Sequence, residues 1–226
     1  MTGIDLSALE IRVTDKARAY RFYDELFAWT LPDHTTTPAS ASRIETLFTD
    51  DRSAPAVRLW FESDDPATTL VRFRKLGGNA DDTSDCRDAH GIPVGFRSRQ
   101  KRLPGKAARG ELGVVIVGAA ETAKARRFYG GLCGWTFHQI RQDDRWWTDH
   151  GPVGFFQASL MNIDFEPSAV PRDIVYFYAV PELDRSLEAV RRLGGRTLAP
   201  AMMGPNPVCG GYDDQGTRFG LCVIPG

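Results

Sequence analysis

Apolar residues recur at intervals of three and four in two segments of the chain, one in each half. The segments carry Ala19, Phe22, Tyr23 and Leu26, and Ala125, Phe128, Tyr129 and Leu132. This spacing places the apolar side chains in one stripe and predicts two amphipathic helices that bury that stripe. Two further helices are predicted at 66–76 and 181–193, because each segment opens near a proline and is closed by a Gly-Gly pair.

A short apolar run precedes each predicted helix. The four runs are Leu9 to Val13, Val57 to Phe61, Val114 to Val117 and Ile174 to Val180. Runs of this length bounded by polar residues are typical of β-strands. The order of strand, helix and further strands therefore occurs four times, which predicts an α+β protein with helices on one face of a curved sheet.

The two halves also repeat each other as sequence. RAYRFYDELFAWT (18–30) matches KARRFYGGLCGWT (124–136), FRKLGG matches VRRLGG, and the closing turn 88–91 matches 213–216. Three echoes in the same order indicate a tandem duplication. We predict two domains, residues 1–104 and 111–226. The first is expected to lack edge strands, because Phe22 to Gly95 is a shorter span than Phe128 to Gly220.

The combined pattern A-x-x-F-Y-x-x-L-x-G-W-T, L-G-G and D-x-x-G resembles the vicinal oxygen chelate superfamily, which includes glyoxalase I, bleomycin-resistance proteins and extradiol dioxygenases. It is most similar to actinobacterial two-domain glyoxalase-like proteins, some of which belong to polyketide and anthracycline pathways. The resemblance implies tandem glyoxalase-like domains, each a pair of βαβββ modules with a curved mixed sheet, the first domain shortened. It implies no single chemistry, because this scaffold hosts many.

The resemblance also implies where a divalent metal would be bound. One ligand is expected on the first strand of each module, and another four residues after the glycine of each closing turn. Those positions are occupied by Ala8, Arg58, Val114, Val175, Gly95 and Gly220. None of these side chains is a carboxylate, imidazole or thiolate donor. We therefore expect a metal-independent protein without a cofactor. A metal-dependent lyase or dioxygenase with displaced ligands remains an alternative, with Glu10 and Glu62 as rescue candidates.

Composition and charge narrow the possible partners. The net charge of −1 at pH 7 gives no reason to expect nucleic acid, and the basic residues between 97 and 109 are interpreted as a solvated linker. The chain contains no run of about 18 apolar residues, so no membrane span is predicted. The N-terminus carries Asp5 and Glu10 where a signal peptide would be basic and then apolar, and the four cysteines are scattered. We expect a cytoplasmic monomer or homodimer.

Aromatic residues are concentrated in the predicted strands of the second half, which suits a small, flat, aromatic or polyketide-like ligand. The candidate ligand-binding residues are Trp146, Trp147, Tyr176, Tyr178, Met202 and Arg218. The candidate acid–base residues are His138, His150 and Glu10. The segment 201–212, rich in glycine and proline, is either a lid or a plain connection.

Four charged residues of the first half have the strand phase that faces away from the helices. They are Glu10, Arg12, Arg58 and Glu62. They either pair and close the concave face, or orient a polar ligand.

Three functions stay open. The first is an accessory cyclase, isomerase or hydroxylation-type enzyme of antibiotic biosynthesis. The second is a drug-sequestering resistance protein, and the third is the metal enzyme with displaced ligands.

Overall fold

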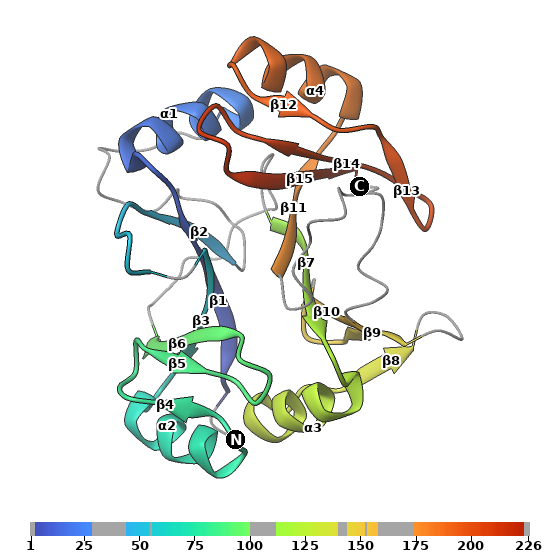
Figure 1. The fold of residues 1–226 in the computed structure, drawn as a ribbon. Coiled ribbons are helices and arrows are strands. Elements are labelled where there is room, and N and C mark those ends of the chain that lie inside the picture. Colours follow the sequence, from blue (N-terminus) through green and yellow to red (C-terminus); the bar gives the residue numbers. More distant parts are fainter. Residues whose placement is uncertain are drawn as a thin grey trace. The chain divides into compact units, whose positions relative to one another are not determined.

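The computed structural model describes residues 3–28, 44–54, 56–99, 112–139, 144–151, 153–157 and 174–223 (Figure 1). The first half contains β1 (Asp5–Arg12), α1 (Lys16–Phe27), β2 (Glu45–Thr49), β3 (Val57–Ser63), α2 (Pro66–Lys75), β4 (Asn79–Ala80), β5 (Cys86–Arg87) and β6 (Pro93–Ser98). The second half contains β7 (Leu112–Ala119), α3 (Thr122–Cys133), β8 (Phe137–Gln139), β9 (Arg145–Thr148), β10 (Val153–Gln157), β11 (Ile174–Val180), α4 (Leu183–Arg192), β12 (Arg196–Thr197), β13 (Ala201–Met203), β14 (Asn206–Tyr212) and β15 (Arg218–Val223).

Each half of the sequence forms its own sheet. The described strands of the first half have the order β2-β1-β3-β6-β5-β4. Those of the second half have the order β12-β14-β15-β11-β7-β10-β9-β8, with β13 paired to β14. Both sheets are mixed, because β3–β6, β7–β10 and β11–β15 are parallel pairs whereas pairs such as β5–β6 and β14–β15 are antiparallel. This arrangement confirms the predicted α+β fold.

The strand count confirms that the first half is shortened within the described residues. Among the described residues, α2 and α3 are each followed by three strands and α4 by four, whereas α1 is followed only by β2. Trp29 and Thr30, which close the first copy of the repeated motif, lie outside the described residues. The segment after Gly78 has two strands of two residues each, β4 and β5, before β6, whereas the matching segment after Gly195 has three, β12 to β14, before β15; this is the strand that we expected to be missing.

The helix boundaries follow local chemistry. Asp15 and Asp65 cap α1 and α2, because their side chains accept hydrogen bonds from Arg18 N and Thr68 N. Gly77 after α2 has a φ of 95°, a left-handed conformation that glycine adopts without strain. Its neighbour Gly78 is needed for space, because a Cβ there would lie 2.3 Å from the ring of Phe73. The Gly-Gly pair therefore combines a helix stop with a close packing contact.

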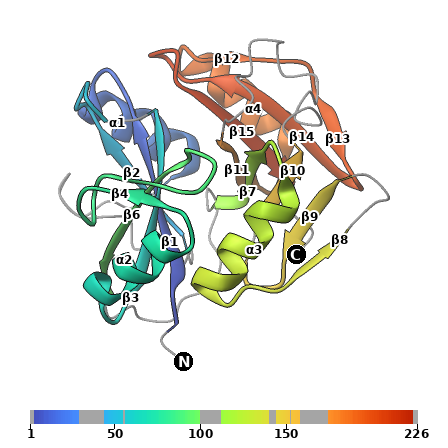
Figure 2. The same ribbon diagram turned by 60° about the horizontal axis from the view of Figure 1, so that its bottom comes forward.

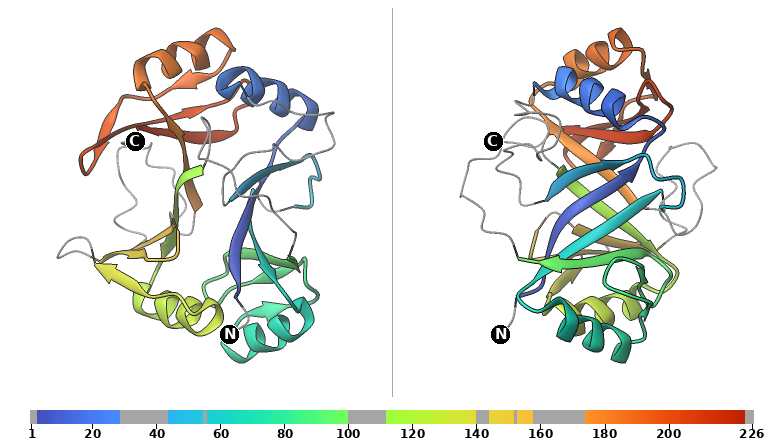
Figure 3. Two further views of the ribbon diagram at one scale, coloured as in Figure 1. Left: turned by 180° about the vertical axis from the view of Figure 1, so that it is seen from behind. Right: turned by 90° about the vertical axis from the view of Figure 1, so that its left-hand side faces the viewer.

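The contacts divide the chain into two compact units that each draw on both halves. Unit 1 contains residues 1–9, 57–102 and 115–174, and unit 2 contains 10–56, 103–114 and 175–226. In unit 1, α2 lies beside α3; in unit 2, α1 lies beside α4 (Figures 2 and 3). The predicted boundaries at 104 and 111 lie outside the described residues and stay a prediction.

A buried carboxylate links the two halves within unit 1. The Tyr129 hydroxyl on α3 donates a 2.8 Å hydrogen bond to Asp88 Oδ2 in the closing turn of the first half. Asp88 Oδ1 accepts from the backbone N–H groups of His90 and Ile92. Burial raises the pKa of Asp88, and these hydrogen bonds oppose the rise by favouring the carboxylate. Asp213 organises the equivalent turn in unit 2 through the N–H groups of Gln215 and Thr217.

We predict that Tyr129→Phe lowers the free energy of unfolding by about 1–3 kcal/mol, because it removes the hydroxyl donor from a buried carboxylate. Urea denaturation at neutral pH measures this loss. The loss is expected to shrink in an Asp88→Asn background, where no charge needs the donor. Equal losses in both backgrounds would contradict the proposed pairing.

Candidate functional site

Strand register shows which side chains share the helix-free face of the second sheet. His138 on β8 pairs with Trp147 on β9, and Trp147 pairs with Gly154 on β10. Directly paired residues point to the same face of a sheet. The opposite face packs on α3, because the Phe155 ring lies 4.9 Å from that of Tyr129. The helix-free face, here called the β8–β10 face, therefore carries His138, Arg145, Trp147, Gly154 and Phe156.

A histidine–aspartate pair lies at the outer edge of this face. His138 Nδ1 is 2.8 Å from Asp149 Oδ1, and Thr136 Oγ1 donates a 2.6 Å hydrogen bond to Asp149 Oδ2. The hydrogen bonds from Thr136 and then His138 lower the pKa of Asp149, so this carboxylate stays ionised at neutral pH. An ionised Asp149 accepts the Nδ1 proton and leaves Nε2 of a neutral His138 as a proton acceptor.

His150 lies in the same turn but plays a different part. Its side chain is exposed, and its backbone N–H donates to Thr148 Oγ1 at 3.1 Å. Its charge when protonated helps to lower the pKa of Asp149. Of the two predicted catalytic histidines, the hydrogen bonds orient the imidazole of His138.

Trp147 supplies a half-buried aromatic surface beside His138. Its ring meets Phe156 edge to face, with centroids 5.6 Å apart. A Cβ on Gly154 would lie 3.1 Å from the Trp147 ring, so the glycine leaves the indole room to lie across β10. The β8–β10 face thus joins a proton acceptor to an apolar ring surface.

Trp146 points the other way, although it was predicted to bind the same ligand. The Arg126 guanidinium of α3 stacks 3.6 Å from the Trp146 ring centroid, and the indole N–H donates to Asp144 Oδ1 at 2.8 Å. Successive residues of a strand alternate between faces, so Trp146 and Trp147 cannot share one. Trp146 holds the sheet against α3.

Tyr176 and Tyr178 also differ from their predicted placement. The Tyr178 ring is fully buried and lies 4.9 Å from Phe27 and 5.6 Å from Tyr23, both on α1. Tyr176 is buried as well, and its hydroxyl donates to the backbone oxygen of Arg218 at 2.6 Å. These tyrosines pack in the core of unit 2, and Tyr178 faces α1.

The other predicted site residues also belong to unit 2. Met202 on β13 is 60% exposed, Arg218 begins β15 opposite Tyr212, and Glu10 is half-buried on β1. The histidines and tryptophans belong to unit 1. The segment 201–212 is a hairpin of β13 and β14 rather than a loop, which leaves its predicted role as a lid without support. The ligand contacts predicted for Met202 and Arg218 and the catalytic role of Glu10 stay predictions.

Aromatic rings occupy the space above the two closing-turn positions where the resemblance implies a metal ligand. Gly95 pairs with Trp60 on β3, and a Cβ on Gly95 would lie 2.6 Å from the indole. Gly220 pairs with Phe177 on β11, and its Cβ would lie 2.4 Å from that ring. A glutamate at either position would collide with the ring of the neighbouring strand.

The rescue candidate Glu62 is held in an ion pair. Its carboxylate lies 3.1 Å from Arg97 Nη2, and Arg97 Nε donates to Ser7 Oγ at 3.2 Å. Glu62 and Ser7 are both buried. Within the described ranges, no three His, Cys, Asp or Glu side chains are grouped so that they could hold a metal ion. The residues present do not fit the metal site that the resemblance implies, and metal independence itself stays a prediction.

Sequence reasoning missed Arg97 as the partner of Glu62, because it assigned residues 97–109 to a linker. Arg97 lies on β6, and Arg99 just after it pairs with Asp5 and Asp64 at 2.8 and 2.9 Å. The alternation of side chains along a strand could have indicated this role, because Arg97 follows Gly95 by two residues and therefore lies on the same face of the sheet. The later basic residues of that stretch lie outside the described residues.

None of the helices that the structure describes is long and apolar enough to span a membrane.

Comparison with known proteins identifies the fold. The sequence matches no family model and no curated protein. Among solved structures it is similar to the 2,3-dioxygenase LapB from Pseudomonas sp. KL28, with a TM-score of 0.62, 12% identity, and coverage of 100% of this chain and 94% of that one. It is also similar to the Mn(II)-bound glyoxalase from Novosphingobium aromaticivorans, with a TM-score of 0.64, 8% identity, and coverage of 99% and 83%.

A mutant of 4-hydroxymandelate synthase from Streptomyces coelicolor gives a TM-score of 0.60 at 14% identity, covering 98% of this chain and 93% of that one. The chain therefore has the two-domain α+β fold of these dioxygenase and glyoxalase structures, as its sequence pattern predicted. Identities this low establish the fold alone.

We predict that Gly95→Ala lowers the free energy of unfolding by about 1–3 kcal/mol, because the added methyl group overlaps the indole of Trp60. The same change in a Trp60→Ala background is expected to cost less, because the space is then empty. Chemical denaturation of the four proteins of this cycle provides the measurement. Additive costs would show that Trp60 does not occupy the space above Gly95.

Proposed function

We propose that this protein binds a small aromatic, polyketide-like molecule on the β8–β10 face and rearranges it without a metal ion. The observation that carries the proposal is the 2.8 Å contact between His138 and Asp149, on the same strand pair as Trp147. A proton acceptor beside an apolar ring suits an isomerase or cyclase of a biosynthetic pathway. This is the accessory-enzyme class, one of the three functions that the sequence leaves open.

In this proposal His138 moves a proton between two atoms of the substrate. Its Nε2 accepts a proton from an acidic C–H or O–H group, and Asp149 stabilises the imidazolium that results. The same proton then returns to a different substrate atom. These two proton transfers are redox-neutral and need no further reactant, so the proposal is confined to isomerisation and cyclisation.

Ligand binding is assigned to the aromatic surface beside the histidine. Trp147 is half-buried, and Phe156 supports its ring from the side. A flat ligand stacked on the indole would bury apolar area while it keeps a polar edge near His138. Trp146 has no part in this contact, because α3 covers its ring.

A drug-sequestering resistance protein is the second candidate. The observation that favours it is the exposure of His138, whose side chain is 55% accessible although catalytic bases are commonly shielded. Binding alone would need Trp147 and Phe156 and no proton transfer. The two candidates therefore differ in what a His138 variant does.

We predict that Trp147→Ala weakens binding of a dihydroxyanthraquinone, used as a flat polyketide-like probe, by about 2 kcal/mol. Trp146→Ala is the matched control and is expected to bind the probe like the wild type. Titration by fluorescence or calorimetry, with and without a chelator, measures both. Equal losses in the two variants, or a chelator that abolishes binding, would refute the assigned surface.

We further predict that His138→Gln lowers turnover by about 10²–10⁴-fold, the usual contribution of a general acid–base residue, and leaves probe affinity nearly unchanged. Substrates are sought by incubating the wild type with a panel of aromatic polyketides and detecting isomers by chromatography. His150→Gln is the control and is expected to retain activity. Tight binding with no conversion of any panel member would favour the sequestering protein.

A further inference from the structure

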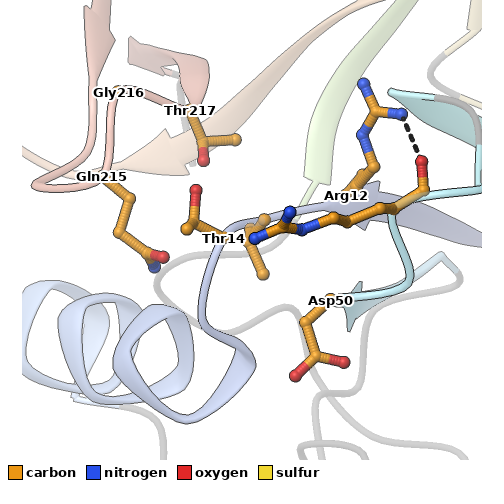
Figure 4. A pocket seen from close by; sticks show the side chains of 8 residues that line it. Arg12, Thr14, Asp50, Gln215, Gly216 and Thr217 are labelled. Carbon is orange, nitrogen blue, oxygen red and sulfur yellow. Dashed lines mark hydrogen bonds between the residues drawn. The ribbon is translucent and has the colours of Figure 1, made fainter.

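Unit 2 contains a polar cavity that the proposed function does not use. Its volume is about 550 Å³, within the usual range of small-molecule sites. Three separate segments line it: the end of β1, the stretch after β2, and the turn before β15. The polar side chains at its walls are Arg12, Thr14, Asp50, Arg52, Gln215 and Thr217. Figure 4 shows Gln215 and Thr217 on one side of this space and Asp50 on the other. It is called the Arg12–Arg52 cavity below.

Hydrogen bonds to α1 hold one wall in place. Gln215 Oε1 accepts from Asp15 N at 2.6 Å, and Gln215 Nε2 donates to Asp15 O at 3.0 Å. The adjacent Asp214 pairs with Arg18. The turn is thus tied to the N-terminal end of α1 at several points, and the cavity wall does not depend on a single contact.

The hydrogen bonds that hold Arg12 in position use only one nitrogen of its guanidinium group. Its Nη1 donates to the backbone oxygen of Ala54 at 2.7 Å. It also donates to the backbone oxygen of Arg52 at 3.3 Å, the bond drawn in Figure 4. Within the described part of the chain, no carboxylate pairs with Arg12 or with the side chain of Arg52. Asp50 is the one acidic residue among those lining the cavity, so the two guanidinium groups leave the lining net positive.

We propose that the Arg12–Arg52 cavity binds a small hydroxylated molecule through its carboxylate or phosphate group. The planar guanidinium of Arg52 matches the two oxygens of such an anion, and Arg12 adds a second positive charge. The hydroxyls of Thr14 and Thr217 contact the polar remainder of the ligand. Asp50 accepts a hydrogen bond from a ligand hydroxyl and disfavours more highly charged anions.

Calorimetric titration with inorganic phosphate and with lactate, at one ionic strength set with chloride, tests this site. The wild type is expected to bind at least one probe saturably, and Arg52→Gln to weaken that binding by about tenfold or more. Arg21→Gln removes the same charge from an exposed position on α1 outside the cavity. That control is expected to bind within about twofold of the wild type, because a distant exposed charge contributes little.

Each outcome decides the proposal. Preference for phosphate or for lactate identifies the anionic group that the cavity takes. The Arg52→Gln protein is expected to unfold at the wild-type temperature, because no hydrogen bond from this side chain to a described residue is lost. The proposal is overturned if the wild type binds neither probe saturably, or if the Arg52→Gln and Arg21→Gln proteins bind alike. The Trp147→Ala variant separates the two sites, since it is expected to bind both anions normally.

Discussion

The two compact units depend on one repeated constraint, the buried aspartate of each closing turn. Asp88 and Asp213 each accept two backbone N–H groups, which shapes the turn around the carboxylate. A carboxylate removed from water needs such donors, because an unsatisfied buried charge is costly. For Asp88 a third donor is Tyr129, which lies on a helix of the other half of the sequence. In unit 2, burial above all raises the pKa of Tyr23, the residue that matches Tyr129 in the repeat, and Tyr176, Tyr178 and then Asp213 add to this rise. A tyrosine–aspartate hydrogen bond thus joins the two halves of the sequence in unit 1, whereas Asp213 in unit 2 accepts from the backbone of its own turn.

Side chains occupy the space near the positions where the sequence resemblance implies a metal ligand. Trp60 and Phe177 cover glycines on their neighbouring strands, and Glu62 is held by Arg97. These contacts turn positions suited to cation ligands into packed surface. The oriented histidine lies instead on the outer strands of the second sheet, where Thr136 and Asp149 fix its geometry.

The two candidate sites are built from different chemical groups. The β8–β10 face offers one half-buried indole and one oriented imidazole, and its residues come from strands close in sequence. The Arg12–Arg52 cavity offers guanidinium and hydroxyl groups gathered from segments that are some 200 residues apart, as the Asp15–Gln215 contact illustrates. An apolar ring surface and a net positive cavity select molecules with different functional groups.

The sequence alone determined the features that arise from local patterns. The three-four spacing predicted α1 and α3, the Gly-Gly pairs predicted the ends of α2 and α4, and the repeat predicted the tandem fold with its shortened first half. The absence of donors at Gly95 and Gly220 was also visible. Only the tertiary structure decided which of two adjacent tryptophans lies on the helix-free face of the sheet. The sequence pattern does not distinguish Trp146 from Trp147. In the structure α3 packs on the face of the sheet that carries Trp146 and leaves Trp147 on the opposite face. Tyr178 likewise faces α1, a helix that comes from the other half of the chain. The ion pair of Glu62 with Arg97 depends on strand register. The Arg12–Arg52 cavity forms only where three distant segments meet. Local periodicity carries no information about such long-range contacts, because they form only when the modules pack.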